Sequence, residues 1–147
     1  SSDMCSSDLV KTDSLTDKLK SIVIEKRPSF TLTRSAALDR AAECQAQYML
    51  KIKKATHGQP AGSGLEQPED RVKKQGINPQ ITLEVAWFAP VNYYSPGQIA
   101  AVEVFKSSKQ HWLYMTECLG AGQWLYGYCR IKDGEYEVCV IVYAAPK

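Results

Sequence analysis

The segment WLYGYCRIKDGEYEVCVIVY, residues 124–143, decides the fold of this chain. Its two halves, about Trp124 to Lys132 and Glu135 to Tyr143, have the composition of β-strands. The Asp133-Gly134 pair between them is a strong hairpin signal, because these residues accept the backbone angles of a tight turn. The chain is therefore expected to close with an antiparallel hairpin.

The sequence before this hairpin has mainly helical spacing. Leu15, Leu19, Ile22 and Val23 form one apolar stripe, which predicts a helix over about 15–26. The strongest helix is expected over about 35–54. One face of that helix is expected to carry its small and apolar residues, namely Ala37, Ala41, Cys44, Tyr48 and Ile52.

Shorter elements lie between the long helix and the hairpin. A Gly- and Pro-rich loop over 57–64 precedes a short helix that opens at Pro68 and stops at Gly76. A strand or extended segment is expected over 81–88, and another helix over 96–107. Helices that pack against an antiparallel sheet define an α+β fold.

Length and charge limit the class of protein. The 147 residues fit one domain, for which we expect a flexible leader over 1–14 and a folded part over 15–147. Basic and acidic residues number 18 and 16, a net charge of +2 that argues against a nucleic-acid partner. The apolar runs are too short to cross a bilayer, so we expect no transmembrane segment. A membrane anchor outside this sequence stays open, and we expect a monomer.

The five cysteines favour an oxidising compartment. We expect one disulfide among Cys118, Cys129 and Cys139, and a free buried thiol at Cys44, while Cys5 fits either state; two bridges, one or none stay open. Residues 1–8 are polar and lack the pattern of a signal peptide. For a secreted protein, cleavage upstream of Ser1 is expected.

Two histidines and two glutamates are the candidate chemical groups. His57 and His111 are the only histidines of the chain. Glu84 lies inside an apolar run, where a buried carboxylate needs a partner or a cavity. Glu103 lies in the helix predicted over 96–107, eight residues before His111.

These residues stand in an order that resembles the CAP superfamily (cysteine-rich secretory proteins, antigen 5 and pathogenesis-related 1 proteins). The segment 32–49 resembles the first long helix of that family, and Ala55-Thr56-His57 matches its first histidine. Pro68 to Val72 with Gly76 resembles the next helix. Glu84 stands where the family has Gly-Glu-Asn, and the segment 95–111 resembles the stretch that holds the second glutamate and the second histidine.

The resemblance implies a three-layer α-β-α sandwich with a central antiparallel sheet. It also implies that His57, Glu84, Glu103 and His111 line an open cleft. His57 and His111 would be ligands of zinc or another divalent cation, weakly bound. Glu84 and Glu103 would be the acid or base candidates of the cleft, and no other cofactor is implied. Four positions depart from the family pattern, namely Leu83, Val85, Phe105 and Gln110.

Three functions follow as hypotheses. The first is a secreted or cell-surface binding module whose partner is a lipid, a sterol or a host protein. The second is a metal-dependent hydrolase or peptidase that uses the same four residues. The third is a surface antigen with a vestigial cleft.

Overall fold

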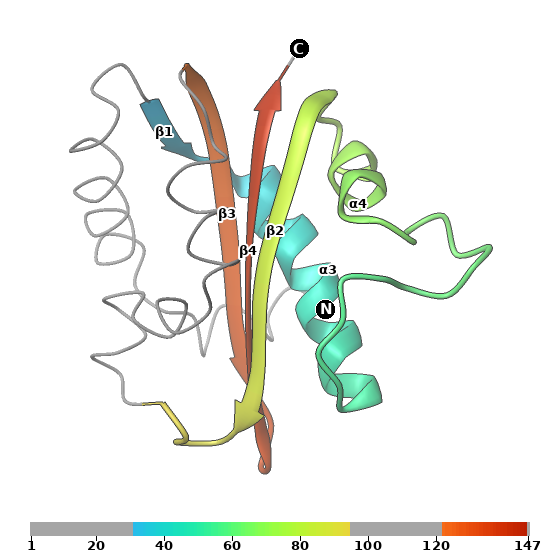
Figure 1. Ribbon diagram of the computed structural model, residues 1–147, viewed down its shortest axis with the longest axis vertical. Coiled ribbons are helices and arrows are strands. Elements are labelled where there is room, and N and C mark those ends of the chain that lie inside the picture. Colours follow the sequence, from blue (N-terminus) through green and yellow to red (C-terminus); the bar gives the residue numbers. More distant parts are fainter. Residues whose placement is uncertain (1–30, 95–121, 147) are drawn as a thin grey trace.

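The computed structural model describes residues 31–94 and 122–146, which form an α+β fold (Figure 1). This confirms the fold class predicted from the sequence. The described elements follow in chain order: β1 (Thr31–Arg34), α3 (Ala36–Ile52), α4 (Pro68–Lys74), β2 (Pro79–Pro90), β3 (Gln123–Lys132) and β4 (Tyr136–Pro146). The predicted elements over 15–26 and 96–107, the leader, Glu103 and His111 lie outside the described residues.

The four strands form one mixed sheet in the order β1-β3-β4-β2. The hairpin of β3 and β4 is antiparallel, as predicted, and its turn contains Asp133 and Gly134. The Asp133 side chain accepts hydrogen bonds from the backbone N–H groups of Glu135 and Tyr136 at 2.8 and 2.7 Å. Strand β2 pairs antiparallel with β4, whereas β1 pairs in parallel with β3. The sheet therefore departs from the expected antiparallel arrangement at β1, which was not predicted as a strand.

Helix α3 lies across β3 and β4 and covers one face of the sheet (Figure 1). Ser35 caps its first turn, because the Ser35 hydroxyl accepts a hydrogen bond from the N–H of Leu38. The buried face differs from the predicted one: Ile52 is exposed, and Cys44 and Tyr48 are half-buried. The buried residues of α3 are Leu38, Ala41, Ala42, Gln45, Ala46, Met49 and Leu50. The apolar pattern missed this face because the polar Gln45 lies at its centre.

A glycine allows the close contact between α3 and β3. A Cβ at Gly127 would lie 2.3 Å from the backbone N of Asp39 and 2.3 Å from the backbone C of Leu38. Two further hydrogen bonds join the start of α3 to β3 beside Gly127. The Asp39 carboxylate accepts from the backbone N–H of Tyr128, and the backbone N–H of Ser35 donates to the carbonyl of Tyr126. The first turn of α3 is thus anchored on β3.

Both faces of the central strands are buried. On the helix side, Cys129, Val138 and Val140 contact the core that α3 forms. The opposite face is aromatic, and its buried residues include Trp87, Tyr126, Tyr128 and Tyr143. A sheet buried on both faces is the centre of an α-β sandwich. In the ranges 31–94 and 122–146, no helix is long and apolar enough to cross a membrane.

Candidate functional site

Glu84 is a buried carboxylate in the middle of β2. Its side chain lies on the sheet face that α3 and α4 cover, and only 1% of it is exposed. A carboxylate removed from water in this way requires charged or hydrogen-bonding partners. The sequence indicated this requirement, and the structure supplies two partners from different elements.

The first partner is Arg71 on α4, whose side chain is also only 1% exposed. One of its terminal nitrogens, Nη2, lies 3.1 Å from Glu84 Oε2 and 3.3 Å from Glu84 Oε1. The same nitrogen donates to the backbone carbonyl of His57 at 2.8 Å, and Nη1 donates to the carbonyl of Leu65 at 2.8 Å. The guanidinium therefore joins β2 to the loop that carries His57.

The second partner of Glu84 is His57. The imidazole Nδ1 lies 2.8 Å from Glu84 Oε1, while 51% of the His57 side chain is exposed. A carboxylate held by a guanidinium accepts hydrogen bonds, so we assign the proton of the neutral imidazole to Nδ1. The lone pair then belongs to Nε2. A carboxylate on one ring nitrogen and a free lone pair on the other is the arrangement of a metal-binding histidine.

The loop that carries His57 is held in place by Gln45 of α3. The Gln45 amide is fully buried and donates to the carbonyls of Thr56 at 2.7 Å and Gly58 at 3.3 Å. The Gln45 side-chain oxygen accepts from the amide of Gln59 at 3.0 Å. These bonds satisfy the polar groups that flank His57, and they explain why a glutamine occupies the buried face of α3.

Of the four residues predicted to line the cleft, the structure brings His57 and Glu84 together. The other two, Glu103 and His111, lie outside the described residues. Within the part of the chain that the structure describes, no group of three or more His, Cys, Asp or Glu side chains stands close enough to hold a metal ion. Sequence reasoning assigned no role to Arg71 or Gln45, although the position of Glu84 in an apolar run indicated that a partner or a cavity must lie nearby.

Among the described residues, His57 can serve zinc or a similar cation only together with further ligands. His57 offers one oriented nitrogen with a carboxylate behind it, which suits zinc and similar metals. One imidazole is fewer than the three protein ligands of an open zinc site. Further ligands must therefore come from other residues, and the resemblance names His111.

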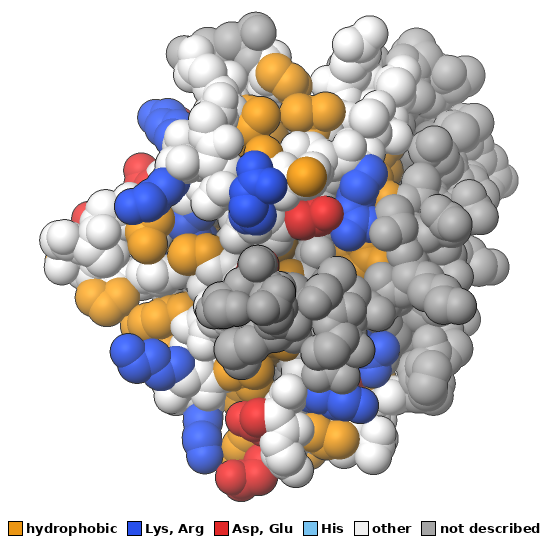
Figure 2. All heavy atoms as spheres, turned by 180° about the vertical axis from the view of Figure 1, so that it is seen from behind, with side chains coloured by type: hydrophobic (Ala, Val, Ile, Leu, Met, Phe, Trp, Pro, Cys, Tyr) orange, Lys and Arg blue, Asp and Glu red, His pale blue; other side chains and the backbone are white. Residues whose placement is uncertain are grey.

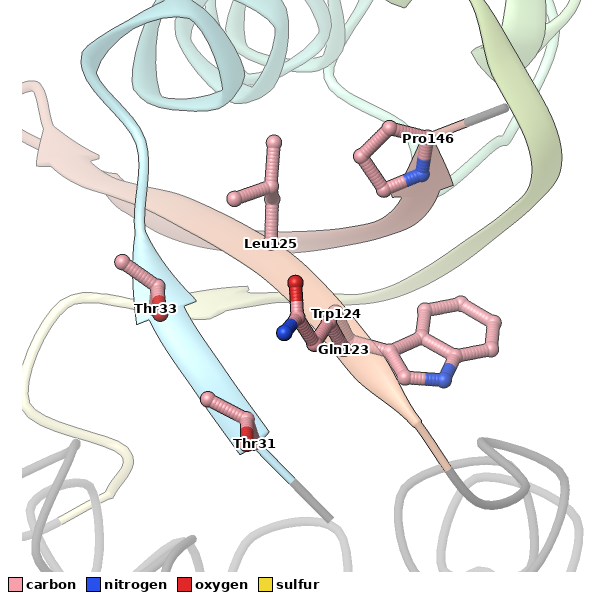
Figure 3. Close-up of a pocket in the computed structure, with 6 residues that line it drawn as sticks. All are labelled: Thr31, Thr33, Gln123, Trp124, Leu125 and Pro146. Atoms are coloured by element: carbon pink, nitrogen blue, oxygen red, sulfur yellow. The ribbon is translucent and has the colours of Figure 1, made fainter.

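A separate pocket of about 280 Å³ lies at one end of the sheet, beside β1. Figure 3 shows Thr31 and Thr33 on β1 beside Gln123 and Leu125 on β3, with Pro146 at the end of β4. Its lining, which also includes Trp124, shares no residue with the His57–Glu84 pair. Seen from behind the first view, basic, acidic and apolar side chains are interspersed over the described surface (Figure 2).

Comparison with known proteins gives a likeness of fold. No protein-family model matches the chain, and no curated protein matches it in sequence. An outer surface protein from Borrelia burgdorferi has a similar structure, with a TM-score of 0.66 and 17% identity over 95% of this chain and 97% of that one.

A second similar structure is an extracellular protein from Bacillus anthracis str. Ames that contains an SCP domain. Its TM-score is 0.53, with 14% identity over 91% of this chain and 44% of that one. At these identities the likeness concerns the fold alone. It agrees in part with the CAP resemblance, because the second protein carries an SCP domain.

Proposed function

We propose that this chain is an extracellular or cell-surface binding module in which His57 is a ligand of zinc or another divalent cation. One observation carries the metal part of the proposal. The imidazole of His57 is half exposed, and its Nδ1 is engaged by a buried carboxylate, so its Nε2 carries the lone pair that would bind a cation. His111 is the proposed second ligand, with Glu103 beside it.

The proposed location is supported by the solved structures with a similar fold. One is an outer surface protein and the other is an extracellular protein. The number and placement of the cysteines agree with an oxidising compartment. Cys44 and Cys139 are free thiols, so a bridge among Cys118, Cys129 and Cys139 would have to join Cys118 to Cys129. We propose that pair.

We assign to Glu84 the orientation of His57 and not proton transfer. A general base must reach the proton that it accepts, directly or through one water. The Glu84 side chain is only 1% exposed, and both of its oxygens lie near Arg71. This burial favours a binding module over a hydrolase that uses Glu84 as its base.

The partners that we propose are a lipid, a sterol or a protein of a host or neighbouring cell. Pockets that enclose drug-sized ligands usually measure about 300–1,000 Å³. The pocket lined by Thr31, Thr33 and Trp124 measures about 280 Å³, which falls below that range. Among the described residues, this pocket alone therefore gives no support for an enclosed sterol or lipid chain.

Calorimetric titration with zinc tests the metal site. Wild-type protein should bind zinc weakly, and His57→Ala and His111→Ala should each abolish binding while the far-ultraviolet circular dichroism stays unchanged. Lys74→Ala is a suitable control, because Lys74 lies exposed on α4 and its loss removes one charge from the helix that carries Arg71. A wild-type protein that binds no zinc would support the vestigial cleft instead.

A further inference from the structure

Arg71 is the most connected side chain around the candidate site. Its guanidinium is buried and contacts three separate pieces of the chain: the carbonyl of Leu65, the carbonyl of His57 and the carboxylate of Glu84. It therefore holds the backbone of His57 and the acid that binds the His57 ring with a single rigid group. Only arginine can make these contacts with one planar group, because its guanidinium carries several donors in fixed directions whereas a lysine ammonium is a compact point charge.

This arrangement controls which nitrogen of His57 faces outward. A carboxylate beside a permanently charged guanidinium stays an acceptor, so the imidazole must donate to it through Nδ1. The bond from Arg71 to the His57 carbonyl fixes the backbone from which that ring projects. We propose that Arg71 is a positioning residue that sets the tautomer of His57 and so presents Nε2 as the binding atom.

A second observation concerns the one donor nitrogen of Arg71 that these contacts do not use. Arg71 Nε is buried and has no hydrogen-bond partner among the described residues. A buried donor without a partner is unfavourable, and such groups in a native protein require an explanation. The ion pair with Glu84 and the two carbonyl bonds hold the guanidinium in place although one of its donors has no partner in the described part of the chain.

The effect of Arg71 on zinc binding rests on the proposed function, whereas its effect on the tautomer of His57 does not. Nitrogen-15 NMR of the metal-free protein therefore tests the inference by itself. At mildly alkaline pH, where imidazoles are neutral, wild-type His57 should carry its proton on Nδ1. His57→Ala assigns the signals, since the chain has only two histidines.

Three variants separate positioning from loop anchoring. Arg71→Met should give a mixture of tautomers and weaken zinc binding by about 10–100-fold, the usual effect of losing an outer-shell partner. Arg71→Lys should restore the Nδ1–H tautomer, because it keeps a cation beside Glu84, although it cannot replace both carbonyl bonds. Arg40→Met removes an exposed arginine of α3 and should change neither measurement.

If Arg71→Met does not fold, the double variant Arg71→Met with Glu84→Gln leaves no unpaired buried charge and should show the same mixture. An unaltered Nδ1–H tautomer in Arg71→Met, or in the double variant where Arg71→Met does not fold, would overturn the inference. Wild-type protein with its proton on Nε2 would overturn it too. Wild-type protein with the expected tautomer and no zinc binding would overturn the metal site and leave the role of Arg71 intact.

Discussion

At the scale of single residues, Glu84 shows how one buried charge organises its surroundings. Breaking a buried ion pair by removing one partner costs about 3–5 kcal/mol, whereas an exposed pair contributes about 0.2–1 kcal/mol. The Glu84–Arg71 pair belongs to the first kind, and the exposed pair of Glu69 with Lys73 belongs to the second. The loop that holds His57 is therefore tied to a contact whose loss would strongly destabilise the fold.

Cys139 is a second buried group, and its chemistry is predictable. Burial raises the pKa of the Cys139 thiol to about 12. Because the thiolate is the reactive form, Cys139 should resist alkylation in the folded protein. Cys44 is also a free thiol but is half-buried, so it should react first. Peptide mass mapping after iodoacetamide treatment should show no label on Cys139 until denaturant is added.

The residue scale also marks the limit of what the sequence predicts about the site. His57 and Glu84 each stand out locally, as one of two histidines and as a carboxylate in an apolar run. That they belong to one cleft, together with Glu103 and His111, was implied only by the CAP resemblance. Arg71 and Gln45 do not stand out, because both types of residue are common on helix surfaces. Their roles arise only when α3, α4 and β2 meet in three dimensions.

At the scale of elements, the contact between α3 and β3 depends on the absence of a side chain. Gly127→Ala would place a Cβ 2.3 Å from backbone atoms of Leu38 and Asp39, which cannot move without shifting the helix. We expect a loss of at least about 3 kcal/mol in the free energy of unfolding, the upper part of the range for overpacked cores. Urea denaturation followed by tryptophan fluorescence measures the change.

The matched control for this substitution lies in the hairpin turn. A Cβ at Gly134 meets nothing within 4 Å, and Gly134 has no positive φ. Gly134→Ala should therefore stay within about 0.5 kcal/mol of the wild type. If both variants lose the same free energy of unfolding, the proposal that Gly127 is needed for the close contact of α3 with β3 is wrong.

The helices and strands that could be predicted are those whose sequence signals, such as turn residues, lie within or next to the element itself. The hairpin of β3 and β4 was predicted almost to its ends, because Asp133 and Gly134 fix the turn and the strands adjoin it. Strand β1 was missed because it has four residues and pairs in parallel with β3, about ninety residues further along the chain. The face of α3 was misjudged because Gln45 is buried by contacts with Thr56 and Gly58, and hydrophobic spacing does not register such contacts.

At the scale of the whole molecule, the central strands of the sheet are buried on both faces, and the face opposite α3 carries titratable groups. Tyr143 and Cys139 lie on that face and are fully buried. Burial raises the pKa of the Tyr143 hydroxyl well above its ordinary value of 10.0, and that of the Cys139 thiol from its ordinary value of 9.0. Both groups hold their protons in the folded chain at a pH where the unfolded chain has released them.

This difference predicts a loss of stability at alkaline pH. Above the unfolded pKa the unfolded chain binds fewer protons than the folded chain, so the free energy of unfolding falls as pH rises. The decline should begin near pH 9.0 through Cys139 and steepen near pH 10.0 through Tyr143, by about 1.4 kcal/mol per pH unit for each group. Cys139→Ala should remove the first part, and Tyr143→Phe, which keeps the ring, should remove the second. Urea denaturation at a series of pH values measures these slopes, and a stability that stays level across that range in the wild type would contradict the burial of both groups.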